Sequence, residues 1–146
     1  RYLLTRRWGQ GGTLLYVMLN PSTADERQND PTIERCERRA RAMGFGAFAV
    51  ANLFGWKATL PKVLKRTADP IGTQNDEVLL GAATRADLIL CGWGTHGAHL
   101  GRGAQVREKL AAANLPLWSL GLTKDGHPRH PLYVSYATEP QRWGGQ

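Results

Sequence analysis

Polar side chains follow three apolar segments of this chain, each close to the point where the segment ends. They are Asn20, Pro21 and Ser22 after residues 13–19, Asn52 within residues 47–53, and His127 and His130 after residues 115–120. Carboxamide and neutral imidazole groups both donate and accept hydrogen bonds without carrying a charge. Held in fixed positions, such groups position a water molecule and stabilise negative charge on a leaving group. Each residue alone is also compatible with an ordinary turn, because Asn-Pro and His-Pro are common turn dipeptides.

The elements that must position these residues follow from the alternation of apolar and amphipathic segments. Strands are predicted over residues 13–19, 47–53, 87–91 and 115–120, and helices over residues 31–43, 73–85 and 104–113. Apolar runs of this length are typical of parallel strands covered on both faces. Strands that alternate with helices indicate βαβ units. The sequence therefore predicts the α/β class, as a three-layer α/β/α sandwich around a sheet of about four parallel strands.

Two of the predicted helices begin at recognisable capping residues. Asp30 is followed by Pro31, which is the order of an N-cap and a first helical residue. Thr73 is followed three residues later by Asp76, as in a capping box. The basic segment 57–66 is expected to form a long loop with a short helical turn.

The parallel arrangement predicts that the polar residues meet at one edge of the sheet. In open α/β sheets, ligands bind just outside the carboxyl ends of the strands. We therefore expect Asn20, Asn52 and the loop 126–133 to form one site. The whole chain, residues 1–146, is expected to be a single domain with a loose tail after about residue 136.

Composition limits the class of protein and suggests a partner. The 146 residues are 42% hydrophobic and 21% charged, which is ordinary for a soluble globular protein. The net charge of +7 favours an anionic partner such as nucleic acid or a nucleotide. No apolar stretch approaches the roughly 20 residues of a membrane span. Cys36 and Cys91 form neither a CxxC pair nor a zinc-ligand pattern, so we expect reduced thiols, no metal and a cytoplasmic protein.

Residues 92–97, Gly-Trp-Gly-Thr-His-Gly, match the G-x-G-x-x-G pattern of dinucleotide-binding loops. That pattern belongs in the first βαβ unit, whereas here it follows the third predicted strand. The acidic residue expected about 20 positions further on is missing from residues 114–120. We interpret the segment as a tight turn that glycine permits, and we expect no nicotinamide, flavin or other cofactor.

The order of these segments resembles that of the uracil-DNA glycosylase superfamily. The matching segments are Leu-Asn-Pro-Ser at 19–22, the strand that ends at Asn52, Ile-Leu-Cys-Gly-Trp-Gly-Thr-His-Gly at 89–97 and His-Pro-Arg-His-Pro-Leu at 127–132. An asparagine in the first segment is closer to the mismatch-specific and single-strand-selective branches. Over nearly the whole chain, the sequence most resembles a bacterial and phage family catalogued as a domain of unknown function, number 1643.

The resemblance implies roles for individual residues. Asn20 would position the attacking water, and Asn52 would hydrogen-bond the edge of a flipped base. His130 or His127 would stabilise negative charge on the departing base, and Leu132 would fill the gap left by the flipped nucleotide. Base contacts are further expected from Pro21 and from Phe54 (or Phe45 or Trp56), and DNA contacts from Ser22, Gly94, Arg129, Lys57 and Lys124.

This chemistry requires neither a metal nor a redox cofactor, because fixed neutral donors stabilise the negative charge that develops on the base. We expect a monofunctional DNA N-glycosidase of base-excision repair, acting as a monomer on a uracil-like, damaged or modified base flipped out of duplex or single-stranded DNA. Asn20 cannot act as a general base, so Asp25 or Asp30 would have to substitute. Two alternatives stay open: a non-catalytic nucleic-acid-binding module with a base pocket, and a hydrolase for free nucleosides or nucleotides.

Overall fold

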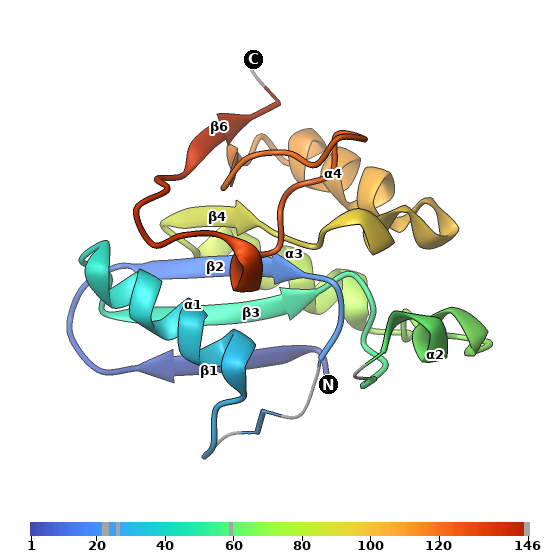
Figure 1. The fold of residues 1–146 in the computed structure, drawn as a ribbon, viewed down its shortest axis with the longest axis horizontal. Helices are drawn as coiled ribbons and strands as arrows, with labels where there is room; N and C mark the ends of the chain where they lie inside the picture. Colours follow the sequence, from blue (N-terminus) through green and yellow to red (C-terminus); the bar gives the residue numbers. More distant parts are fainter. Residues whose placement is uncertain (22–23, 26, 59, 145–146) are drawn as a thin grey trace.

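A six-stranded mixed sheet forms the centre of the computed structural model (Figure 1), in which residues 1–21, 24–25, 27–58 and 60–144 are described. Its strands are β1 (Leu3–Arg7), β2 (Thr13–Met18), β3 (Ala47–Asn52), β4 (Leu88–Cys91), β5 (Leu117–Ser119) and β6 (Gln141–Trp143). They are arranged in the order β1-β3-β2-β4-β5-β6. The central strands β3, β2, β4 and β5 are parallel, and β1 and β6 pair antiparallel at the two edges.

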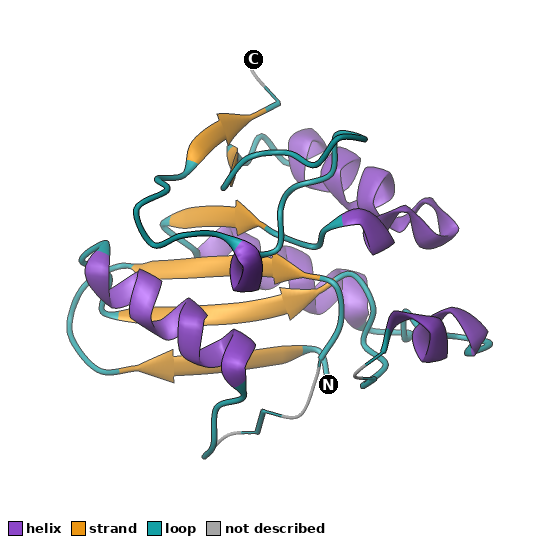
Figure 2. Cartoon of the chain, in the orientation of Figure 1, coloured by secondary structure: helices purple, strands orange, loops and turns teal. Residues whose placement is uncertain are grey.

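Helices cover both faces of this sheet (Figure 2). They are α1 (Pro31–Ala42), α2 (Pro61–Arg66), α3 (Asn75–Arg85) and α4 (Arg102–Ala112), with short 3-10 segments η1 (Thr95–Gly101) and η2 (Pro131–Tyr133). Successive residues of β2 enter different cores: Leu14 and Tyr16 pack with residues of α1, whereas Leu15 and Val17 pack with residues of α3 and α4. Burial on both faces explains why this strand is a continuous apolar run. None of the helices in the described ranges has both the length and the apolar character that crossing a bilayer requires.

The start of one predicted helix is confirmed and that of another is corrected. The Asp30 side chain accepts a hydrogen bond of 2.8 Å from the backbone amide of Ile33, and Pro31 is the first residue of α1. The predicted capping box at Thr73 is wrong, because α3 begins at Asn75 and its N-cap residue, Gln74, makes no side-chain cap. Asn75 instead turns inward and is fully buried.

The α/β class is confirmed, but the prediction of a sheet of about four parallel strands missed both antiparallel edge strands. Strand β1 (Leu3–Arg7) pairs with β3, and β6 (Gln141–Trp143) pairs with β5 in the segment that was predicted to be a loose tail. In β1 only Leu4 is fully buried, and β6 has no fully buried residue. Edge strands of this kind need no apolar run, so the sequence pattern does not distinguish them from loops.

The connections after β2 and β3 leave toward opposite faces of the sheet (Figure 1). The chain passes from β2 to α1 on one face, and from β3 to α3 on the other. Ligands in open α/β sheets bind outside the carboxyl ends of the strands at such a switch point. The topology therefore places the ends of β2, β3 and β4 around the position where a site is expected.

Candidate functional site

A cavity of about 640 Å³ opens at the carboxyl ends of the parallel strands, and we call it the Asn52 cavity. Its volume lies within the roughly 300–1,000 Å³ that is usual for small-molecule sites. Seven of the residues predicted for the site line it: Asn20, Pro21, Asn52, Gly94, Arg129, His130 and Leu132. The structure thus brings together polar residues that are up to 110 positions apart in the sequence, from Asn20 to His130.

Asn20 follows β2, and its side-chain nitrogen is held by loop carbonyls. Nδ2 donates hydrogen bonds to the backbone oxygens of Ala58 at 2.8 Å and of Trp56 and Pro21 at 3.2 Å. Three oxygen acceptors around one atom identify that atom as the amide nitrogen. The amide oxygen accepts no hydrogen bond within the described ranges, and as an acceptor it can bind a water molecule but cannot take its proton.

Asn52 ends β3 and is 2% exposed. In the part of the chain that the structure describes, its amide oxygen Oδ1 is buried without a hydrogen-bond partner. An unpaired buried acceptor costs about 1–3 kcal/mol, so a protein retains one for a reason such as a functional role, local strain or a bound water molecule. Asn75 Oδ1 and Arg1 Nε are unpaired in the same way, and among the three residues Asn52 is the one that both ends a parallel strand and lines the cavity.

A second layer of side chains fixes the backbone around Asn52. Asn75, the first residue of α3, donates from Nδ2 to the carbonyl oxygens of Asn52 at 2.8 Å and Leu53 at 2.9 Å. The buried guanidinium of Arg102 donates from Nε to the Leu53 carbonyl at 2.7 Å and pairs with Asp76. Two helices thus hold the end of β3 in one conformation.

His130 presents one defined hydrogen-bond donor. Its Nδ1 accepts a hydrogen bond of 3.2 Å from the backbone amide of Leu132, which assigns the proton of the neutral ring to Nε2. Burial lowers the pKa of His130 to about 4, and the negative charge of Asp30 opposes this shift only partly. At neutral pH the ring is therefore uncharged and carries its proton on Nε2, which donates to no other group in the described part of the chain.

The loop that carries His130 crosses closely over the exit of β4. The Gly94 amide donates to the Pro128 carbonyl at 2.8 Å, and Gly94 has a φ of 72°. A Cβ atom at Gly92 would lie 2.8 Å from Cδ of Pro131. Glycine is required here because the two loops approach too closely for a side chain. The predicted turn at residues 92–97 therefore positions the histidine loop.

Several predicted site residues lie elsewhere. His127 lines a different cavity, and Phe54 is fully buried against the ring of His99 at a centroid distance of 5.6 Å. Lys57 lines a small surface pocket beside Arg1, and Lys124 is exposed and lines neither cavity. Ser22 lies outside the described residues. Of the two histidines that the sequence left open, the structure therefore places only His130 beside Asn20 and Asn52.

Other lining residues received no role from the sequence. They include Thr32, Trp93, His96, Thr123 and Tyr133. His96 lies 3.0 Å through Nδ1 from Nζ of Lys65, and burial and the Lys65 charge lower its pKa. Tyr133 is 75% exposed and packs beside the His130 ring at a centroid distance of 5.7 Å. Only the segment around His96 carried a signal, through its likeness to the superfamily, because the other residues come close only in the folded chain.

The electrostatic character of the Asn52 cavity is neutral to basic. None of its described lining residues is acidic. Asp25 accepts hydrogen bonds from the backbone amides of Arg27 and Gln28, which lower its pKa, and Asp30 caps α1. Neither carboxylate lines the cavity, so neither is placed to activate a water there. Within the described ranges, no group of three or more His, Cys, Asp or Glu residues could hold a metal ion.

A family model described as "Protein of unknown function (DUF1643)" matches residues 1–132 of the chain. The described residues that line the Asn52 cavity lie within the matched region, with the exception of Tyr133. No curated protein and no solved structure matches the chain.

Proposed function

Because the chain belongs to the family described as "Protein of unknown function (DUF1643)", its function has to be inferred from its site, and we propose that it is a DNA N-glycosidase acting on a flipped base. The proposal includes a uracil-DNA-glycosylase-like sandwich fold, with which the parallel central strands and the helices on both faces are compatible. It is supported by the sequence resemblance of the Asn20, Asn52 and His130 segments to that superfamily. The target would be a uracil-like, damaged or modified base.

One observation carries the proposal: a neutral histidine donor, an unpaired buried amide and a second amide acceptor line one cavity. Asn52 Oδ1 matches an N–H group on the edge of a base. Asn20 Oδ1 matches a water placed beside the sugar. His130 Nε2–H matches an oxygen of the base that gains negative charge.

The reaction uses these groups in one sequence. The bond between the sugar C1′ and the base nitrogen breaks, and the base leaves with the electron pair as an anion that His130 stabilises. The oxygen of the water held by Asn20 bonds to C1′, and its proton passes to solvent. A neutral imidazole is suited to this task, because the base gains negative charge in the transition state. The interaction between that charge and the fixed N–H dipole is therefore stronger in the transition state than in the ground state.

The test is a base-release assay. The protein is incubated with oligonucleotides that contain uracil, mismatched thymine, hypoxanthine or hydroxymethyl bases, and strand cleavage is measured after alkali. Asn20→Ala and His130→Ala are each expected to lower the single-turnover rate about 10- to 100-fold, because the first variant no longer holds the water and the second loses a donor to the departing base. Gln10→Ala, at the opposite end of β2, is the matched control. Absence of release from every substrate by folded protein that binds DNA would refute the enzymatic proposal.

A non-catalytic module that recognises an extruded base is a second candidate. The absence of an acidic residue among the described lining residues favours it, because no group is placed to take a proton from water. This candidate predicts binding that weakens with salt and no base release. A free-nucleoside hydrolase differs from both, since its rate should not change in Leu132→Ala or Tyr133→Ala, which alter the cavity mouth that a DNA strand would contact.

A further inference from the structure

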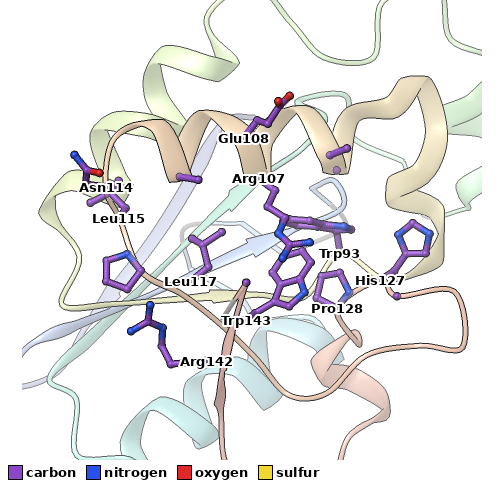
Figure 3. Close-up of a pocket in the computed structure, with 16 residues that line it drawn as sticks. Trp93, Arg107, Glu108, Asn114, Leu115, Leu117, His127, Pro128, Arg142 and Trp143 are labelled. Carbon is purple, nitrogen blue, oxygen red and sulfur yellow. The ribbon is translucent and has the colours of Figure 1, made fainter. Parts of the chain in front are cut away.

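A second cavity, of about 710 Å³, lies between α4 and the edge formed by β5 and β6 (Figure 3). We call it the Trp143 cavity. Its walls include Trp93, Leu117, Pro128 and Trp143, and the guanidinium groups of Arg107 and Arg142 border it. None of the chemistry described for the Asn52 cavity uses these two arginines.

The two indoles and the Arg107 guanidinium pack against one another. The rings of Trp93 and Trp143 meet edge to face with centroids 5.4 Å apart, and Cζ of Arg107 lies 4.0 Å from the Trp143 ring centroid. Within the described residues, neither Arg107 nor Arg142 donates a hydrogen bond or forms an ion pair. Their N–H groups are therefore available to an anion, beside an aromatic surface on which a planar group can stack.

The charges around the cavity favour an anionic ligand. Among the described lining residues, Glu108 is the only acidic one, and Figure 3 shows its carboxylate directed away from the indoles. Arg107, Arg142 and His127 supply donors on the other sides. A base stacked on an aromatic ring together with a phosphate bound by arginine is a recurring combination in nucleic-acid binding.

The two cavities also share walls. Trp93 lines both of them. In the loop after β5, His127 and Pro128 line the Trp143 cavity, whereas Arg129 and His130 line the Asn52 cavity. One indole and four consecutive residues therefore separate the two spaces.

We propose that the Trp143 cavity binds a nucleotide, with the base against Trp143 and the phosphate on Arg107 and Arg142. Two sources supply this chemistry. The ligand is either a free mononucleotide or a neighbouring nucleotide of the strand whose target base enters the Asn52 cavity. The second form rests on the proposed function, and the first does not.

Calorimetric titration tests the proposal with four probes: thymidine 5′-monophosphate, thymidine, inorganic phosphate and oligothymidylates of two to eight nucleotides. Wild-type protein is expected to bind a phosphorylated nucleotide saturably, and Arg107→Gln is expected to weaken that binding at least about 10-fold, because a charged hydrogen-bond donor is lost. Arg85→Gln, an exposed arginine on α3, is the charge-matched control. Trp143→Leu is a second variant, and circular dichroism establishes that each variant is folded.

The outcomes distinguish the two sources of the nucleotide from each other, and this proposal from the proposed function. Arg107-dependent binding of oligothymidylates but not of the monophosphate supports the strand form, and Arg107-dependent binding of the monophosphate supports the free-nucleotide form. Saturable binding by neither probe, equal affinity in Arg107→Gln, or phosphate bound as tightly as the nucleotide would overturn the proposal. Because the readout is binding, a failure to release any base would refute the proposed function and leave this result standing.

Discussion

At the scale of single residues, the candidate site contains a buried amide oxygen that costs stability, because it has no partner among the described residues. Asn52 Oδ1 is buried and unpaired within the described chain. Replacing such a group with an apolar side chain of similar size removes the desolvation cost. Asn52→Leu is therefore expected to raise the free energy of unfolding by about 1 kcal/mol while it abolishes base binding. Urea denaturation measures the first effect, and a less stable Asn52→Leu protein would contradict the idea of an unpaired acceptor.

His130 makes folding depend on pH. Its pKa is lowered by burial to about 4, against about 6.5 in the unfolded chain, so between these values the unfolded state binds more protons. The contribution of neutral His130 to the free energy of unfolding is fully present above about pH 6.5. It is lost as the pH falls through 4, and the total loss is about 3 kcal/mol.

Urea midpoints at pH 7.5 and pH 4.5 measure the effect, with His130→Gln as the comparison. This variant is expected to lose less stability over that interval than the wild type. His96, whose pKa is also lowered, keeps its contribution in both proteins. An equal loss in the two proteins would show that His130 does not carry the effect.

That Asn20 and Asn52 line one cavity could be predicted from the sequence for a specific reason. Asn20 and Asn52 end apolar strands, and the carboxyl ends of parallel strands converge. The sequence pattern could not decide between His127 and His130, because the two residues lie only three positions apart in the same loop. Only the fold of that loop, with the Gly94 amide on the Pro128 carbonyl, directs them to different cavities.

At the scale of elements, helix α1 holds the loop that carries His130. Arg39 is 3% exposed and donates to the carbonyl oxygens of Val134, Ser135 and Thr138 at 2.9–3.2 Å. Arg39→Met would remove all three hydrogen bonds, although Val134 keeps the bond from Arg35 and Ser135 keeps the bond from the Thr138 amide. We expect a loss of about 1–3 kcal/mol in unfolding free energy and faster amide exchange in residues 131–138, because bonds from a charged donor are lost. Arg38→Met is the control on the same helix, since its exposed pair with Glu34 contributes little. Similar losses in both variants would contradict the assignment.

The elements that the sequence missed lack a periodic apolar signal. Strand β6 is Gln-Arg-Trp and leaves two of its three residues exposed, so only its pairing with β5 defines it. The sequence pattern also gives no indication that Arg39 is buried, although its guanidinium lies under the segment 134–138. Strand β6 and the burial of Arg39 both depend on contacts between residues that are far apart in the chain, and local sequence patterns contain no information on such contacts.

At the scale of the whole molecule, part of the excess of basic residues lies on one short helix. Helix α2 (Pro61–Arg66) carries Lys62, Lys65 and Arg66, and it projects from the body of the protein beside the loops of the Asn52 cavity (Figure 1). Lys65 contacts His96, which lines that cavity. A strand whose base enters the cavity would therefore pass beside a basic helix.

If DNA passes over α2, the salt dependence of DNA binding should report the phosphate contacts that the lysines of α2 make. Each lysine that neutralises a phosphate contributes about 0.7 to 0.9 to the slope of log affinity against log salt concentration, because one condensed counterion is released. Lys65→Gln is expected to reduce that slope by about one and to weaken binding by a similar factor for every sequence, since a phosphate contact carries no base information. Fluorescence anisotropy with two unrelated oligonucleotides at several salt concentrations measures both quantities.

Arg7→Gln, on β1 at the opposite end of the sheet, should leave the slope unchanged. An unchanged slope in Lys65→Gln would mean that the nucleic acid does not pass over α2.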